Sequence, residues 1–125
     1  MAVLSQKIKL VDSKGEKIVE ALFDSVATYS FVKEEIAEKI EQVVRLPEPR
    51  VFSTAKEDVS LKIEKRISVD FYINGYRLSD EFFVSSQITE DVIIGVSTLQ
   101  KWRLKLDFEN EKIIVDPKVT RLIII

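Results

Sequence analysis

The sequence contains no cysteine and no histidine among its 125 residues. These absences exclude disulfide bonds, thiol nucleophiles, Ser-His-Asp triads and zinc sites built from cysteine or histidine. Carboxylates, alcohols, lysines and tyrosines remain for chemistry. No segment has the apolar length of a membrane span, and residues 1–7 lack the apolar stretch of a signal peptide. We therefore expect a soluble, cytoplasmic protein that does not bind a membrane.

Glycine and proline are scarce, with three of each, whereas hydrophobic residues make up 46% of the chain. That content is enough for the core of one domain, and we expect residues 1–125 to form a single domain. Nineteen basic residues nearly balance 21 acidic ones, and the basic residues are scattered along the chain. This distribution predicts no basic face and hence no nucleic-acid partner.

Runs of alternating or continuous apolar residues predict a mainly β protein with one or two short helices. The expected strands cover residues 7–12, 17–23, 50–55, 59–64, 66–73, 76–84, 92–94, 104–108 and 112–116. Residues 12–15 and the pair Asn74-Gly75 have the composition of tight turns. Asn-Gly is typical of a type I′ turn, so it predicts a hairpin.

The sequence predicts two helices and a terminal strand. Ser30 is a candidate N-cap for a helix over 31–44, which the proline-containing segment 46–49 would end, and a short helix is expected over 97–102. The apolar segment 120–125 predicts a strand whose unpaired backbone groups need a partner strand, as in a dimer.

Two segments carry the functional signal. Ala21-Leu22-Phe23-Asp24-Ser25-Val26-Ala27-Thr28 places an acid and an alcohol directly after an apolar strand. Val92-Ile93-Ile94-Gly95 follows, with Leu99 and Leu106-Asp107-Phe108 downstream. In their order, separation and flanking strands, these segments resemble the retropepsin-like (retroviral-type) aspartic peptidases over roughly residues 5–117.

The resemblance implies a closed, β-barrel-like single lobe that works as a homodimer on a peptide or protein, with its terminal strands in the interface. Each chain would donate one aspartate, because two adjacent carboxylates share a proton and activate water between them. The resemblance implies catalytic roles for Asp24 and Ser25, and substrate contacts from Val26, Ala27, Thr28, Thr54, Ala55, Lys56 and Ile94. It implies no cofactor and no metal.

The chain departs from the family pattern at two places. Val26 stands where the family has glycine, and residues 54–58, where the tip of the flap would fall, contain no glycine. A stiff side chain at Val26 would project towards the substrate or separate the two aspartates. Two hypotheses follow: an aspartic endopeptidase, or a non-catalytic dimer of the same fold that binds peptides or a protein partner.

Other interpretations of the same residues remain open. Asp24 and Ser25 could be ordinary turn residues that satisfy backbone N–H groups. Gly95 could simply begin a helix, Trp102 could be a core aromatic, and Tyr29 could cover the edge of the core.

Two alternatives belong to other functional classes. A small barrel could bind single-stranded nucleic acid through Phe71, Tyr72 and Tyr76, although the charge balance argues against it. Carboxylates at 107, 109 and 111 could attract Ca²⁺ or Mg²⁺, but their spacing lacks the glycine and the ligand count of an EF-hand.

Overall fold

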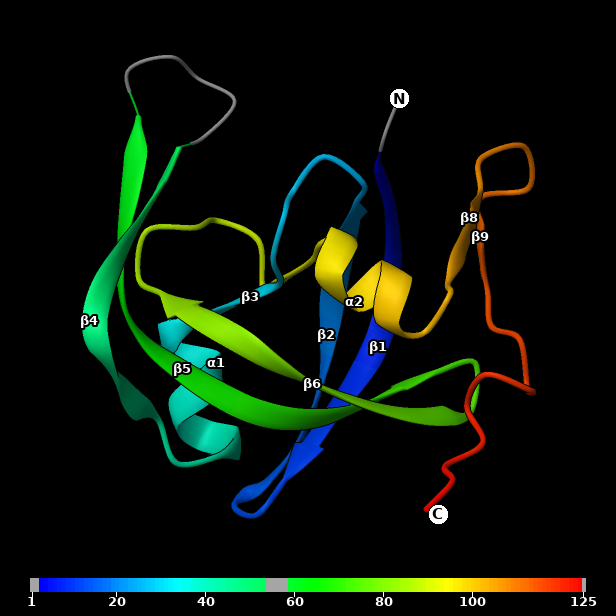
Figure 1. Ribbon diagram of the computed structural model, residues 1–125, viewed down its shortest axis with the longest axis horizontal. Helices are drawn as coiled ribbons and strands as arrows, with labels where there is room; N and C mark the ends of the chain where they lie inside the picture. Colours follow the sequence, from blue (N-terminus) through cyan, green and yellow to red (C-terminus); the bar gives the residue numbers. More distant parts are fainter. Residues whose placement is uncertain (1–2, 54–58, 125) are drawn as a thin grey trace.

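The computed structural model describes residues 3–53 and 59–124. Within them, nine strands and two short helices follow one another along the chain (Figure 1). They are β1 (Val3–Asp12), β2 (Gly15–Asp24), β3 (Phe31–Lys33), α1 (Glu34–Ile40), β4 (Val44–Ser53), β5 (Ser60–Ile73), β6 (Tyr76–Ser85), β7 (Val92–Ile94), α2 (Val96–Lys101), β8 (Lys105–Asp107) and β9 (Lys112–Ile114). The predicted mainly β class is confirmed.

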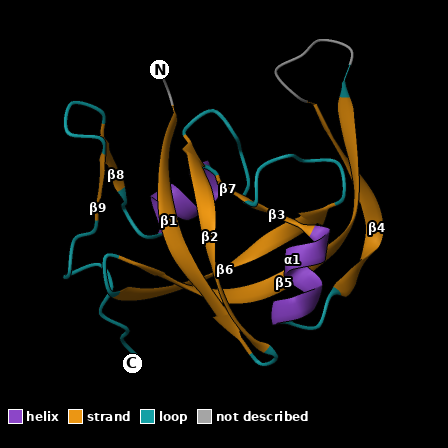
Figure 2. Ribbon diagram, turned by 180° about the vertical axis from the view of Figure 1, so that it is seen from behind, coloured by secondary structure: helices purple, strands orange, loops and turns teal. Residues whose placement is uncertain are grey.

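Six of the strands form a closed barrel. The hydrogen-bonded order is β1-β2-β7-β3-β6-β5, and residues 9–11 of β1 pair with residues 70–72 of β5 to complete the ring. Strand β4 extends the sheet beyond β5, and the small β8–β9 hairpin lies at the opposite end of the molecule (Figure 2). Closure satisfies the backbone groups that edge strands would leave unpaired.

Both predicted hairpins at the centre of the barrel are confirmed. Strands β1 and β2 pair along their full lengths around residues 13–14, because alternate residues of each strand face the core. Strands β5 and β6 meet at Asn74 and Gly75, whose φ angles of 52° and 84° are those of the expected type I′ turn. Strand β5 is continuous, whereas the sequence predicted two strands over 59–73.

The helix predicted over 31–44 is wrong in its bounds. Phe31 and Val32 belong to β3, and they are buried between β6 and β7. The helix covers only Glu34–Ile40, and its N-cap is Lys33 rather than Ser30. An aromatic residue followed by a β-branched one favours the sheet when two neighbouring strands are available for pairing.

The segment 46–49 was expected to end a helix, but it lies inside β4. The pairing of β4 with β5 shifts register between Arg45 and Arg50, so the two prolines fall where the ladder is irregular. Strand β4 is also an edge strand, and prolines are tolerated at edges and bulges.

The terminal strand expected over 120–125 is absent from the described part of the segment. Residues 117–124 form turns and coil, and Leu122, Ile123 and Ile124 are 82%, 76% and 97% exposed. No strand of the described chain pairs with them. At the other end, Val3 and Leu4 pair with Asp24 and Phe23.

The core has two parts. The larger one fills the barrel and includes Phe23, Phe71 and Phe82, each fully buried. The smaller one lies beneath β4 and is built around Phe31, Ile63 and Phe83. In the residues that the structure describes, no helix is long and apolar enough to cross a membrane.

Candidate active site

Asp24 is the last residue of β2, where the strand leaves the barrel and the chain turns towards β3. Its Oδ1 accepts a hydrogen bond of 2.9 Å from the backbone N–H of Val26, which is a local Asx-type turn. The carboxylate is half-buried. The barrel therefore holds the Asp24 carboxylate at the end of β2, and the hydrogen bond from Val26 orients its side chain.

A groove of about 360 Å³ opens beside this turn. Among the residues that the structure describes, Asp24 is the only carboxylate that lines it, and most of the other lining residues are apolar or aromatic. The lining residues are Asp24, Val26, Ala27, Thr28, Tyr29, Phe31, Phe52, Ser53, Leu61, Ile88 and Ile93. A mainly apolar groove with a few polar groups is typical of a ligand-binding site.

Aromatic rings form one wall of the groove. Phe52 of β4 packs edge-to-face against Tyr29 and Phe31, with centroid separations of 5.8 and 5.2 Å. Tyr29 also packs edge-to-face against Phe83 at 5.4 Å. The guanidinium of Arg50 lies over the rings of Tyr29 and Phe83. This geometry ties β4 to the turn that carries the acid.

The sequence analysis did not predict that these aromatic rings would line the groove. It treated Tyr29 as a cover for the core edge and Phe52 as one residue of a strand. The position of Phe52, two residues before the expected flap tip, could have indicated this wall. A strand that leads into a flap is expected to lie beside the ligand. The rings themselves come from three separate elements, which local patterns do not bring together.

The backbone at Val26 does not require glycine. In the described residues, the only non-glycine positions with positive φ are Asn74, Arg103 and Glu111. The effect of valine at this position is therefore spatial. Its side chain is 72% exposed and lines the groove beside Asp24.

The turn rests on the first residues of α2. The carbonyl oxygens of Ala27 and Thr28 accept hydrogen bonds from the backbone N–H groups of Val96 and Ser97, at 2.7 and 3.0 Å. Gly95 lies against the same turn so closely that an added Cβ would be 2.2 Å from the carbonyl oxygen of Tyr29. Its φ of −98° is open to any residue, so close approach is what requires glycine here.

The structure places four of the nine residues that the sequence assigned to the site in the groove. Asp24, Val26, Ala27 and Thr28 line the groove. Ser25 lies in the same turn and is exposed, but it does not line the groove. The assigned residues at the flap tip, Thr54, Ala55 and Lys56, lie outside the described residues.

Ile94 requires a correction. Its side chain is fully buried in the core, and the neighbouring Ile93 faces the groove instead. Successive residues of a strand point to opposite faces, so a shift of one residue exchanges core for groove.

The alternatives from other functional classes find little support in the geometry. Phe71 is fully buried, so it offers no stacking surface for a base. The carboxylate of Asp107 accepts hydrogen bonds from the backbone and side-chain nitrogens of Asn110, and these bonds lower its pKa. Trp102 is buried, and its Nε1 donates to the carbonyl oxygen of Ser79, as a core aromatic would.

Comparison with known proteins gives a consistent result. A family model described as retroviral aspartyl protease matches residues 6–121. The structure is similar to the retroviral protease-like domain of Ddi1 from Leishmania major, with a TM-score of 0.67, 19% identity, and coverage of 94% of this chain and 90% of that one. It is also similar to EIAV protease in complex with the inhibitor HBY-793, with a TM-score of 0.58, 15% identity, and coverage of 83% and 91%.

At these levels of sequence identity, the two solved structures are evidence for the fold and not for the function. The predicted retropepsin-like fold is confirmed. The comparison with curated proteins found no match.

Proposed function

Because the chain belongs to the retroviral aspartyl protease family, we propose that it is a homodimeric aspartic endopeptidase that hydrolyses peptide or protein substrates through paired Asp24 carboxylates. One observation carries the proposal. Asp24 is the last residue of a barrel strand, and within residues 3–53 and 59–124 it is the only carboxylate that lines the mainly apolar groove beside that strand. An extended peptide with apolar side chains fits such a groove.

The chemistry requires a second copy of the chain. Hydrolysis by this route needs one carboxylate to take a proton from water and another to protonate the departing amine. The described part of one groove supplies a single carboxylate. Two Asp24 turns that meet across a two-fold axis would supply the pair, and Ser25 would hold the two turns in register.

The ends of the chain support the proposed dimer. Leu122, Ile123 and Ile124 leave apolar side chains almost fully exposed, which is costly in water. The strand at residues 3–4 runs beside Asp24. The segments at both ends of each copy would meet in the interface, and members of the family act as dimers.

A second candidate function has its own observation. Val26 projects into the groove beside Asp24 with 72% of its surface exposed. In a dimer, two such side chains would occupy space that the scissile peptide or the water needs. The alternative is therefore a non-catalytic dimer of the same fold that binds a peptide or protein partner in the groove.

Cleavage of unfolded casein from mildly acidic to neutral pH separates the two functions. The purified wild-type protein is compared with Asp24→Asn and Val26→Gly. The endopeptidase proposal predicts cleavage by the wild type, none by Asp24→Asn, and faster cleavage by Val26→Gly. Cleavage only after glycine is restored would favour the binding module. If neither the wild type nor Val26→Gly cleaves casein, the endopeptidase proposal is wrong.

A further inference from the structure

A chain of hydrogen bonds runs from the support of the Asp24 turn to Asp80 of β6. The backbone N–H of Gly95 donates to Ser30 Oγ at 3.0 Å. Ser30 Oγ is 2.6 Å from Thr98 Oγ1, and Thr98 Oγ1 donates to Asp80 Oδ2 at 2.6 Å. Ser30 and Thr98 are 1% and 0% exposed, so the two bonds that Ser30 makes are buried, whereas the bond to Asp80 is partly buried.

The two ends of this chain fix the direction of every bond in it. A backbone N–H only donates, and a carboxylate only accepts. Thr98 donates its hydroxyl proton to Asp80, so Thr98 Oγ1 must accept the hydrogen bond from Ser30. Ser30 Oγ therefore donates to Thr98 and accepts from the N–H of Gly95. The hydroxyl hydrogens of Ser30 and Thr98 can therefore each point in only one direction, and the carboxylate of Asp80 determines that direction.

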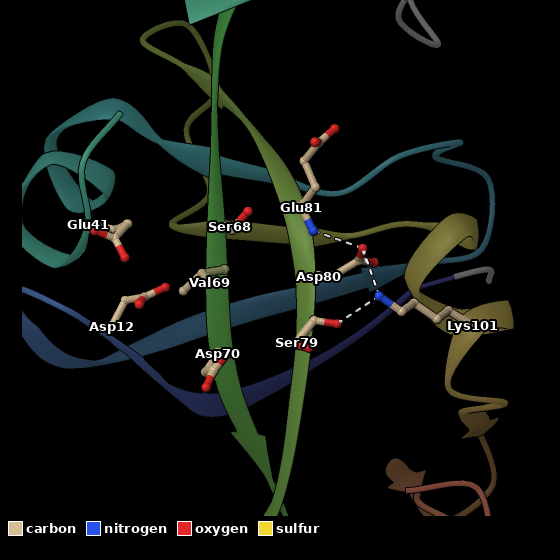
Figure 3. A pocket seen from close by; sticks show the side chains of 9 residues that line it. All are labelled: Asp12, Glu41, Ser68, Val69, Asp70, Ser79, Asp80, Glu81 and Lys101. Atoms are coloured by element: carbon tan, nitrogen blue, oxygen red, sulfur yellow. Dashed lines mark hydrogen bonds and ion pairs between the residues drawn. The ribbon is translucent and has the colours of Figure 1, made fainter. Parts of the chain in front are cut away.

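Asp80 is itself held firmly. Its Oδ1 accepts from the backbone N–H of Glu81 at 2.8 Å and lies 3.6 Å from Nζ of Lys101 (Figure 3). The Lys101 ammonium also reaches the carbonyl oxygen of Ser79, at 3.3 Å. The Asp80 side chain is only 16% exposed. It is therefore a fixed acceptor at the junction of β6 and α2.

We propose that Asp80 is a positioning residue for the Asp24 turn and acts through Thr98 and Ser30 on the backbone of Gly95. The residues after Gly95 donate the two hydrogen bonds that hold the carbonyl oxygens of residues 27 and 28. A shift of Gly95 is transmitted to the turn, because the two backbones are already in close contact. An effect of Asp80 on peptide cleavage rests on the function proposed above, whereas its effect on the position of the Asp24 turn does not.

Amide hydrogen exchange measures the positioning directly. Thr98→Val keeps the shape of the side chain and removes the hydroxyl, and Thr98→Ser restores a hydroxyl. We expect exchange at the amides of residues 95–97 to become about tenfold faster in Thr98→Val, close to wild type in Thr98→Ser, and unchanged at the core amides of β5 and β6. Unchanged exchange at residues 95–97, or an equal increase at all protected amides, would overturn the proposal.

Carboxylate variants provide an independent test if Thr98→Val does not fold. Asp80→Asn retains an acceptor but loses the charge, and its amide can also donate, so the bond directions are no longer fixed. We expect faster exchange at residues 95–97 in Asp80→Asn. The matched control is Asp70→Asn on the adjacent strand, whose carboxylate pairs with Arg77 and does not reach the turn. Equal exchange in these two variants would overturn the proposal.

Peptide cleavage by the same variants separates this inference from the proposed function. If the wild type is an endopeptidase, Thr98→Val should lower kcat about tenfold or more with little change in KM, because a small displacement of the acid affects the reacting geometry most. A change in KM alone would overturn the link to catalysis. If the wild type cleaves no peptide but exchange at residues 95–97 responds as described, the proposed function fails and the positioning role of Asp80 stands.

Discussion

Replacing Gly95 by alanine is expected to displace the Asp24 turn. The added Cβ would lie 2.2 Å from the carbonyl oxygen and 2.6 Å from the carbonyl carbon of Tyr29, and 2.8 Å from the carbonyl oxygen of Ala27. These are backbone atoms, so no side-chain rotation relieves the contacts. Ordinary contact begins near 3.4 Å, and the two segments must therefore separate by about 1 Å.

The cost of this separation follows from two terms. Overpacking a close contact costs about 1–3 kcal/mol. The two hydrogen bonds from residues 96 and 97 to the turn would also weaken, at about 1 kcal/mol each. Together these contributions lead us to expect Gly95→Ala to lower the free energy of unfolding by roughly 3–5 kcal/mol, as measured by urea denaturation.

Gly75→Ala is the matched control. Its added Cβ would meet no heavy atom within 4 Å, but its φ of 84° is strained for alanine. This variant should cost only about 1–2 kcal/mol and leave the amide spectra of residues 24–28 unchanged. A Gly95→Ala protein as stable as wild type, or no less stable than Gly75→Ala, would refute the steric argument.

Two further predictions concern other parts of the chain. Burial, and then the hydrogen bond and charge of Glu41, raise the pKa of Asp12, whereas the backbone N–H of Gln42, and then Asp12, lower the pKa of Glu41 to about 2. A raised carboxyl pKa means that the native state binds the proton more tightly, so stability falls as pH rises through the folded pKa of Asp12. Asp12→Asn should remove this fall in urea midpoints measured as the pH is raised from the ordinary carboxyl pKa of 3.8, and an unchanged pH dependence would contradict the assignment. Deleting residues 122–125 should convert the proposed dimer to monomer in sedimentation equilibrium; an unchanged dimer mass would rule out this tail as the main interface.

Short sequence patterns were sufficient to predict the two hairpins and to propose Asp24 as a candidate acid. The β1–β2 and β5–β6 pairs combine apolar alternation with turn residues a few positions apart, so their partners are adjacent in the sequence. Asp24 was proposed as the acid because a polar pair follows an apolar strand directly. Each of these features is contained in a short window of residues.

The rest depends on partners that are distant in the sequence. Residues 31–33 fit the start of a helix in isolation, but their pairing with β6 and β7 places them in the sheet. In the all-apolar strand β7 there is no alternation to identify the residue that faces the groove, which is why Ile93 and Ile94 were exchanged. Ser30 and Thr98 are 68 residues apart, and no local motif predicts that their hydroxyls meet.

The separation of the two Asp24 carboxylates in a crystal structure of the protein in its solution oligomer tests the central claim most directly. The proposed endopeptidase requires a dimer with these carboxylates about 3 Å apart and with space beside them for one water that reaches both. Carboxylates that the Val26 side chains hold beyond the reach of a shared water would contradict the endopeptidase, and so would a monomer.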